Sequence, residues 1–372
     1  MPHDLVIIAE DWGRHPSSTQ HLASELAGSR KVLYVNSLGL RRPRLTRADL
    51  GRAVRKFVDL FGTNRPEGQE LPPGLTVLAP LALPFPGNEL AGRINHCLLG
   101  YLIRRALKRR GIARPVLWIS MPTGIDAVGT MGERAVVYYC GDDFGALDGV
   151  DHAPVQRLEQ RCIEAARLIF AVSPVLAARL PPDRTMLLEH GVDLDRFTHP
   201  AVRAADLPSG PVAGYYGNIC ERLDQALLAD TARLLPNWSF VLIGDIRVPV
   251  DRLAAEPNIR FLGRRPHALL PGYAQHWTIS LLPFLDTAMV RASNPLKLRE
   301  YLAAGRPVVA TPMPAALSFR DVIDIAEDAA GFAAALRAAA LAPPDPERLR
   351  ARVVRESWAA RAAAAAARID AL

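Results

Sequence analysis

The stretch "SNPLKLREYLAAGRPVVAT" (293–311) predicts a helix, a turn at glycine and proline, and then a short apolar strand. Pro295 suits the first turn of a helix, where its missing N–H group needs no partner. Lys297 and Glu300 lie three residues apart and therefore share one helix face. A cation in the first turn opposes the helix dipole, so Lys297 indicates a bound anion such as a diphosphate. A solvated ion pair between the two side chains is the alternative.

Short apolar runs alternate with helical stretches on both sides of this segment. The runs are continuous in hydrophobicity, which is typical of parallel strands covered on both faces of a sheet. Amphipathic helices are expected between strands, for example over 17–28 and 90–110. The predicted strands cover 5–9, 31–36, 75–80, 115–120, 135–140 and 168–173 in the first half, and 212–217, 239–244, 259–263, 279–284 and 307–311 in the second.

The length of 372 residues exceeds what one hydrophobic core usually serves. A polar, proline-containing stretch over 190–210 interrupts the alternation and indicates a domain boundary. We therefore predict two doubly wound, Rossmann-like domains, 1–198 and 199–345. A final helix over about 346–371, within a C-terminal segment 346–372, is expected to pack back on the first domain.

The chain carries a formal net charge of +7, which favours anionic partners such as phosphates or acidic lipid surfaces. An arginine-biased genome is the alternative explanation. The basic residues lack interleaved aromatic residues and no reader motif is present, so no nucleic-acid partner is expected. Two basic clusters comprise Arg41, Arg42 and Arg44, and Arg104, Arg105, Lys108, Arg109 and Arg110.

Several features indicate a cytoplasmic protein. The four cysteines are scattered without a CxxC pair, which fits reduced thiols better than a disulfide framework or a zinc site. The first residues lack the pattern of a secretory signal. No uninterrupted apolar run reaches the ~18 residues that a membrane span needs.

In open parallel sheets, ligands bind where the strands end, beside helix N-termini. After the first predicted strand, the segment "EDWGRHPSSTQHL" turns at Gly13, and Ser17 or Ser18 can cap the next helix. A capped helix here offers its amides to an anion or a sugar hydroxyl. His15 and His21 are either functional or incidental to that helix.

After the strand over 135–140, the segment "GDDFGALDG" places Asp142 and Asp143 at a strand end. One of them can act as a general base toward an attacking hydroxyl. A solvated turn is the alternative, and no second cluster of carboxylates or histidines supports a metal site. His190 with the following glycine is expected to end a further strand.

The second half offers a similar set of strand ends. The strand over 212–217 ends at Gly217 and Asn218, without the GxGxxG pattern of a dinucleotide site. Arg222 is expected near the first turn of the next helix, where it can reach a phosphate or remain a surface arginine. The loop that contains Arg264 and His267 is of the kind whose backbone reads the edge of a base.

Four segments together resemble the GT-B nucleotide-sugar glycosyltransferases: "HGVDLDRF", "YYGNICERLD", "FLGRRPHALLPGYAQHWTISLLPF" and "NPLKLREYLAAGRPVVAT". The resemblance is strongest to bacterial family 4 enzymes and to xanthan-type glucuronosyltransferases, and it covers about 187–311. The segment "YYCGDDF" is similar to a motif of many bacterial members. The resemblance implies the GT-B fold, in which two Rossmann-like parallel-sheet domains face each other across a cleft.

The resemblance also implies roles for individual residues. Glu300 is expected to bind the donor ribose, Lys297 and Arg222 to face the diphosphate, and Asp142 or Asp143 to serve as base, with His21 as a further catalytic candidate. The expected donor site also includes Gly217, Asn218, Arg264, His267, Asn294 and Leu298. The expected acceptor or sugar region includes Gly13, Arg14, His15, Ser17 and His190.

One position departs from the family pattern. Family 4 enzymes usually carry a second glutamate eight positions before the ribose-binding one, and this chain has Ala292 there. The departure makes an inverting displacement assisted by an aspartate an alternative to the retaining mechanism. No DxD motif is evident, so we expect no metal and no cofactor, with helix dipoles and basic side chains stabilising the leaving diphosphate.

The sequence thus predicts transfer of a sugar from a nucleoside diphosphate sugar to a glycan or a polyprenyl-diphosphate-linked acceptor. The basic clusters are expected to contact the anionic inner face of the plasma membrane. Two alternatives are a non-hydrolysing nucleotide-sugar epimerase, which shares this architecture, and a catalytically inactive partner in glycan assembly.

Overall fold

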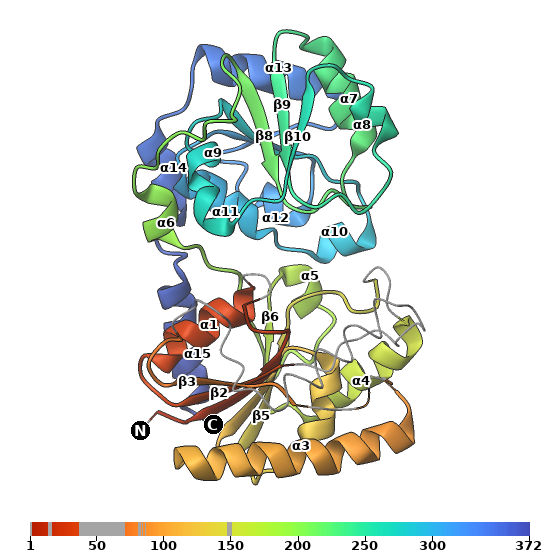
Figure 1. Cartoon of the computed structure of the whole chain (residues 1–372), viewed down its shortest axis with the longest axis vertical. Coiled ribbons are helices and arrows are strands. Elements are labelled where there is room, and N and C mark those ends of the chain that lie inside the picture. Colours follow the sequence, from red (N-terminus) through yellow and green to blue (C-terminus); the bar gives the residue numbers. More distant parts are fainter. Residues whose placement is uncertain are drawn as a thin grey trace. The chain divides into compact units, whose positions relative to one another are not determined.

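The chain folds into two compact units, Met1–Glu189 with Trp358–Leu372, and His190–Ser357. Each unit is built around its own parallel sheet, and Figure 1 shows how the helices surround the two sheets. The computed structural model describes residues 2–13, 17–36, 71–80, 83, 85, 87–146 and 151–372.

The first unit contains a parallel sheet in the order β3-β2-β1-β4-β5-β6-β7. The order reverses at β1, where Ile7 lies between Tyr34 of β2 and Trp118 of β4. This reversal is the switch point of a doubly wound sheet. The strands are β1 (Leu5–Ala9), β2 (Val32–Asn36), β3 (Leu75–Leu78), β4 (Val116–Ile119), β5 (Ala135–Cys140), β6 (Leu168–Ala171) and β7 (Thr185–Leu187).

Helices cover both faces of this sheet. In Figure 1, α1 and the C-terminal α15 lie on one face, and α3 and α4 lie on the other. The helices of the unit are α1 (Ser18–Ala27), α3 (Glu89–Arg110), the 3-10 helix η1 (Pro122–Ala127), α4 (His152–Ala165), α5 (Pro174–Ala177) and α15 (Trp358–Ile369).

The second unit repeats the same winding, with the strand order β10-β9-β8-β11-β12-β13. Its strands are β8 (Val212–Tyr216), β9 (Ser239–Ile243), β10 (Ile259–Gly263), β11 (Ile279–Leu282), β12 (Val308–Ala310) and β13 (Asp324–Ile325). Its helices are α6 (Leu194–Thr198), α7 (Gln225–Leu234), α8 (Asp251–Ala254), η2 (His267–Leu269), α9 (Pro271–Ala274), α10 (Ala288–Ala292), α11 (Leu296–Ala303), α12 (Pro314–Leu317), α13 (Ala329–Leu341) and α14 (Pro346–Val353).

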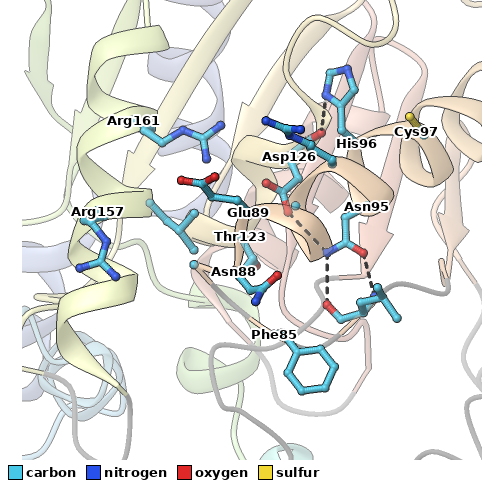
Figure 2. A pocket seen from close by; sticks show the side chains of 15 residues that line it. Phe85, Asn88, Glu89, Asn95, His96, Cys97, Thr123, Asp126, Arg157 and Arg161 are labelled. Carbon is cyan, nitrogen blue, oxygen red and sulfur yellow. Dashed lines mark hydrogen bonds between the residues drawn. The ribbon is translucent and has the colours of Figure 1, made fainter.

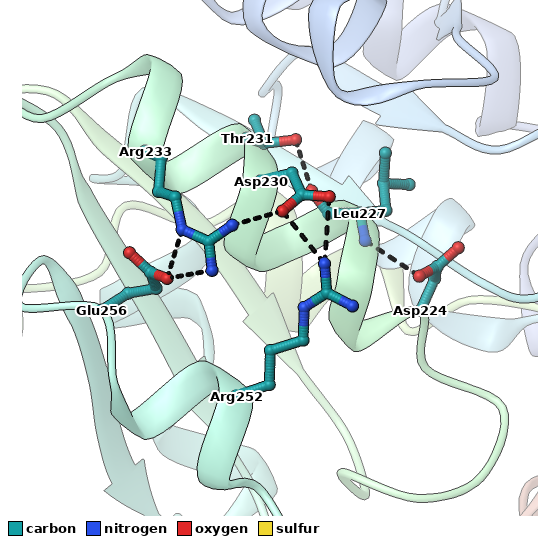
Figure 3. A network of polar contacts seen from close by, with 7 residues as sticks. All are labelled: Asp224, Leu227, Asp230, Thr231, Arg233, Arg252 and Glu256. Atoms are coloured by element: carbon teal, nitrogen blue, oxygen red, sulfur yellow. Dashed lines mark hydrogen bonds and ion pairs between the residues drawn. The ribbon is translucent and has the colours of Figure 1, made fainter.

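A network of charged side chains fastens two helices of the second unit to each other (Figure 3). Asp230 of α7 accepts hydrogen bonds from Arg233, one turn later, and from Arg252 of α8. Arg233 also pairs with Glu256 at 2.6 Å. Asp224 caps the start of α7 by accepting from the amide of Leu227 at 2.9 Å. The network fixes the helix that follows the end of β8.

The predicted strands are confirmed, with ends that differ by one or two residues. Two strands differ from the prediction. Strand β7 ends at Leu187, so the prediction that His190 ends a strand is wrong. Strand β13, with two residues, was not predicted. Neither strand carries an apolar run long enough to stand out in the sequence.

The C-terminal segment contains two helices where one was predicted over 346–371. Helix α14 belongs to the second unit and α15 to the first. Between them, Ser357 forms a parallel bridge with Val192, whose amide donates to the carbonyl of Glu356 at 2.9 Å. At this bridge the chain is extended, so α14 and α15 are two separate helices. On the first unit, Trp358 stacks on His21 of α1 and Asp370 pairs with Arg30 at 2.8 Å.

Candidate functional site

In the second unit, two strand ends approach each other so closely that both require glycine. Gly217, after β8, has a φ of +135°, and Gly244, after β9, has a φ of +150°. A Cβ atom on Gly244 would lie 2.0 Å from the carbonyl oxygen of Gly217. Only glycine permits this conformation and this contact. Because Gly217 has no side chain, a side chain of α11 can occupy the space beside the end of β8.

That side chain is Lys297, in the first turn of α11. Its Nζ donates to the Tyr215 hydroxyl at 3.2 Å and lies over the rings of Tyr215 and Phe284, at 4.5 and 5.3 Å from their centroids. A Cβ atom on Gly217 would lie only 2.4 Å from this Nζ. Burial, followed by the positive charge of Arg222, lowers the pKa of Lys297 to about 7. An anion bound here would restore its ordinary charge.

Glu300 lies one turn further along α11 and is held by two partners. The Tyr216 hydroxyl donates to it at 2.7 Å, and Nε2 of His267 lies 2.8 Å from its other oxygen. Burial alone would raise the pKa of the Glu300 carboxyl, but His267 and Tyr216 outweigh burial and hold that pKa below its ordinary value. The carboxylate is therefore ionised and oriented, as an acceptor for hydroxyl groups must be.

His267 is oriented from its other side by Arg196, whose guanidinium lies 2.8 Å from Nδ1. Arg196 pairs in turn with Asp193, which caps α6 by accepting from the amide of Arg196. The chain Asp193–Arg196–His267–Glu300 thus links α6, η2 and α11. It brings together Glu300 and His267, two of the predicted donor-site residues.

Asn294, another predicted donor-site residue, takes part in a buried polar cluster. Its Oδ1 accepts from Arg299 at 2.6 Å, and Arg299 also donates to Glu356 at 2.5 Å. Arg299 is fully buried, between Lys297 and Glu300 in the sequence but on another face of α11. The cluster fixes the orientation of α11 and therefore of the two site residues.

The other predicted donor-site residues have different environments. Leu298 is fully buried in the core, so its side chain does not reach solvent. Asn218 and Arg264 are exposed. Arg222 lies in the turn before α7, and its carbonyl accepts from the amide of Leu285 at 2.9 Å. Ala292, at the end of α10, is buried with 1% exposure, and no carboxylate stands at that position.

In the first unit, the two adjacent aspartates after β5 differ sharply. Asp143 pairs with Arg179 at 2.5 Å, and it also accepts from the amide of Gly145 at 3.2 Å. These contacts close the turn after the strand. Asp142 is exposed. Asp143 therefore helps to close this turn, and the roles of both aspartates as a base stay predictions.

The predicted residues near the end of β1 mainly organise α1. Ser17 caps α1 by accepting from the amide of Gln20 at 3.2 Å, and it also bonds to Glu10. The amide of Gly13 donates to the side chain of Gln20 at 3.1 Å. The rings of His21 and Trp358 stack with centroids 4.7 Å apart.

The remaining predicted positions lie elsewhere. His190 is buried and belongs to the second unit, at the point where the chain enters it. Arg14 and His15 lie outside the described residues, as do Arg41, Arg42 and Arg44. The predicted roles of all site residues stay predictions.

The sequence did not point to Tyr215, Tyr216 or Arg196, which support the site from β8 and α6. Tyr215 and Tyr216 looked like ordinary strand residues, because alternate sides of a buried strand carry aromatic rings in any sheet. Their hydroxyl groups reach Lys297 and Glu300 only because α11 crosses beside the end of β8.

Comparisons with known proteins bear on this site. Residues 210–354 match the family described as Glycosyl transferases group 1. The match falls within the second unit, and the chain as a whole has the GT-B fold. The solved structures of HepE from Anabaena with UDP-glucose cover 100% of both chains at a TM-score of 0.68 and 12% identity. OtsA from E. coli with UDP-2-fluoro glucose covers 99% of both chains at a TM-score of 0.66 and 10% identity.

A curated relative is TuaH of Bacillus subtilis (strain 168), a candidate teichuronic acid biosynthesis glycosyltransferase. It is 26% identical over 224 residues, which span 54% of this chain and 56% of TuaH. The chain thus matches about half the length of this relative. The GT-B fold and the predicted glycosyltransferase resemblance are confirmed, whereas the narrower likeness to family 4 and xanthan-type enzymes stays a prediction.

Membrane and metal expectations were checked on the described part of the chain. Within the described ranges, no helix combines the length and the apolarity that crossing a bilayer requires. The same ranges contain no group of three or more histidine, cysteine or acidic side chains placed to hold a metal ion. Catalysis without a metal stays a prediction.

Proposed function

We propose that this protein transfers a sugar from a nucleoside diphosphate sugar to a glycan acceptor during polysaccharide synthesis. The observation that carries the proposal is the placement of Lys297 and Glu300 one turn apart on α11, with Lys297 against Tyr215 and Glu300 against Tyr216, the last two residues of β8. The matched domain over 210–354 and the UDP-sugar complexes of HepE and OtsA support the same activity.

The charges of the second unit fit such a donor. A buried amine with its pKa lowered to about 7, close to a second cation at Arg222, needs an anion between or beside them. A diphosphate meets that need and is stabilised as a leaving group by both charges. Glu300, ionised and fixed by His267 and Tyr216, can accept from the vicinal hydroxyls of a ribose.

Asp142 supplies the base in this proposal. It takes the proton from the attacking acceptor hydroxyl, a bond forms between that oxygen and the anomeric carbon, and the bond from the anomeric carbon to the diphosphate breaks. Asp143 cannot do this without giving up Arg179. Because Ala292 offers no carboxylate to the donor sugar, we propose a single displacement with inversion of the anomeric centre.

Calorimetry with UDP-, GDP- and dTDP-sugars tests the donor part of the proposal. One class is expected to bind saturably to the wild-type chain, and Lys297→Met is expected to abolish or strongly weaken binding. Absence of binding by every class would refute the proposal. Incubation with the bound donor but no acceptor is the second test, because formation of an epimerised sugar nucleotide would identify an epimerase instead.

The acceptor side is proposed to operate at an anionic membrane surface on the cytoplasmic side. Helix α3 exposes the apolar side chains of Leu90, Ile94 and Tyr101 along one line of the helix. Its C-terminal half exposes four basic residues, each contributing about 1 kcal/mol near an anionic surface. These residues are Arg104, Arg105, Lys108 and Arg109.

Such a surface fits a polyprenyl-diphosphate-linked acceptor. Co-sedimentation with vesicles that contain phosphatidylglycerol is expected, and vesicles of phosphatidylcholine alone are expected to bind much less. Equal binding to both vesicles would contradict the electrostatic part of this proposal, whereas donor binding would be unaffected by either result.

A further inference from the structure

The first unit contains a cavity of about 840 Å³ that none of the roles above uses. It lies between the N-terminal half of α3, η1 and α4, on the sheet face opposite α1 (Figure 2). Its volume is in the range of sites for small molecules, which span roughly 300–1,000 Å³. Its lining combines arginines, carboxylates, an amide and an aromatic ring, so it is a polar site rather than a packing defect.

A buried hydroxyl in the cavity lining has no partner. Thr123 of η1 is only 5% exposed, and within the described residues its Oγ1 forms no hydrogen bond. Buried hydroxyl groups are normally satisfied, because leaving one unmade costs free energy. A threonine in this position therefore indicates a ligand that offers a hydrogen-bonding group to it.

Two arginines on α4 supply positive charge to the same cavity. Arg157 and Arg161 are spaced i, i+4 and therefore lie on one helix face. Neither forms an ion pair with any residue that the structure describes. Arg93 of α3 also lines the cavity, so arginines outnumber the two lining carboxylates even with His96 neutral. The surplus charge fits a ligand with one carboxylate, which a guanidinium can bind through two parallel hydrogen bonds.

The lining also contains an amide and two carboxylates, which suit hydroxyl groups. Asp126 accepts a long hydrogen bond from Asn95 at 3.5 Å, and Asn95 is itself fixed by two hydrogen bonds to the backbone of Leu83. Figure 2 shows the carboxylate of Asp126 directed toward this amide and that of Glu89 nearer to Arg161. The half-exposed ring of Phe85 offers an apolar face. Carboxylates beside an aromatic ring are the groups that recognise a polyhydroxylated ring.

We propose that this cavity binds a carboxylated sugar unit, a uronate, of the acceptor glycan. Arg157 and Arg161 bind its carboxylate, Asp126 and Glu89 accept from its ring hydroxyls, and Thr123 bonds to one of them. The assignment to the acceptor rests on the proposed glycosyltransferase function. The binding of a uronate itself does not depend on that function and is measured separately.

The test uses the full chain and methyl β-D-glucuronide as the probe. Saturation-transfer NMR and calorimetry are expected to show saturable binding, at least tenfold tighter than that of methyl β-D-glucoside, which lacks the carboxylate. Inorganic phosphate is the third ligand. Equal affinity for glucuronide and glucoside would overturn the proposal, and so would phosphate binding as tightly as the glucuronide, because the site would then recognise only an anion.

Three variants locate the binding site. Arg157→Gln is expected to weaken glucuronide binding at least tenfold, whereas Arg134→Gln, at an exposed arginine outside the cavity, is expected to leave it unchanged. Thr123→Val keeps the shape but removes the unpartnered hydroxyl. It is expected to weaken binding several-fold without lowering the melting temperature. Unchanged glucuronide affinity in both Arg157→Gln and Thr123→Val would overturn the proposal.

Donor binding in the same variants separates the two proposals. Arg157→Gln is expected to bind the nucleotide sugar as the wild-type chain does. If the wild-type chain binds the glucuronide but no nucleotide sugar, the uronate site stands and the proposed transferase function fails. If it binds the nucleotide sugar but not the glucuronide, the transferase function stands and the uronate site fails.

Discussion

The two sheets have the same type of strand order, but the charged side chains that follow their strands have different partners. In each sheet the strand order reverses at the strand that comes first in the sequence, β1 or β8, and helices cover both faces. After β5 of the first unit, Asp143 is paired with Arg179, which follows α5. After β8 of the second unit, Lys297 lies partly buried near Arg222, and Glu300, one turn along the same helix, is held by His267 and Tyr216.

This difference bears on where the proposed donor would bind. A strand end whose charges are paired needs no further partner, as at Asp143. A partly buried amine whose pKa is lowered regains its charged form when an anion binds beside it, so the proposed diphosphate suits the end of β8. The same topology thus carries a turn with paired charges in one unit and the proposed anion site in the other.

The largest expected effect separates the two aspartates of the first unit. Asp142→Asn is expected to lower turnover by about 10²–10⁴-fold, because it removes a general base. Asp143→Asn is expected to lower the melting temperature instead, since it breaks the contact with Arg179. Turnover with a saturating donor and thermal unfolding measure the two effects. A large loss of turnover in Asp143→Asn, with Asp142→Asn active, would reverse the assignment.

The next effect concerns donor affinity in the second unit. Glu300→Gln retains the size of the side chain but loses a charged acceptor, and charged hydrogen bonds contribute about 1.5–3 kcal/mol. Donor affinity is therefore expected to fall by roughly 10- to 100-fold. Titration calorimetry measures it, and Glu347→Gln on exposed α14 is the control. An unchanged affinity would remove Glu300 from the donor site.

Lys297 makes donor binding dependent on pH. Its pKa of about 7 in the free protein means that the amine loses its proton as pH rises through that value. A bound diphosphate favours the charged form, so binding takes up a proton at pH 8, and affinity falls as pH rises above 7. Calorimetry in buffers of different ionisation enthalpy measures the uptake. Lys297→Met is expected to show none.

The same residue affects stability with a defined sign. The folded-state pKa of Lys297 lies below that of the unfolded chain, whose ordinary value is 10.5, so the unfolded chain binds more protons between about 7 and 10.5. The contribution of this residue to the free energy of unfolding therefore rises with pH across that window. Chemical unfolding of the wild type and of Lys297→Met at pH 6 and pH 10 measures this contribution.

A smaller effect is expected at His21 in the first unit. The His21–Trp358 stack joins α1 to α15, and aromatic pairs contribute about 0.5–1.5 kcal/mol beyond area burial. His21→Ala is expected to lower the free energy of unfolding by about 1 kcal/mol for this reason, with turnover largely retained. A loss of turnover by two orders of magnitude with unchanged stability would instead support the predicted catalytic role of His21.

The smallest expected effect is a gain. Gly92 lies within α3, and an added Cβ atom would meet Asp126 Oδ1 at 3.5 Å, an ordinary contact. Gly92→Ala is therefore expected to raise the free energy of unfolding by about 0.5–1 kcal/mol, because alanine loses less backbone entropy in a helix. Donor binding in the second unit is expected to remain unchanged. A lower melting temperature would show that α3 needs the glycine.

A structural feature can be predicted from the sequence when the residues that cause it are neighbours in the chain. The buried strands follow from runs of apolar residues such as Leu5–Ala9, and Lys297 stands out because a cation in the first turn opposes the dipole of its own helix. The pairing of Asp143 with Arg179 joins residues on different elements, so no local pattern distinguishes it from Asp142. The contact between Arg299 and Glu356 joins α11 to the segment after α14 and is equally hidden.

The bridge between Val192 and Ser357 has a consequence for engineering the second unit as a separate module. The chain enters and leaves the second unit at residues joined by a hydrogen bond of 2.9 Å, from the Val192 amide to Glu356. The segment His190–Ser357 is therefore an insertion with adjacent ends, within a first unit completed by α15. Such a module is suited to excision, to joining of its ends by a short linker, and to replacement by a homologous segment with a different nucleotide preference.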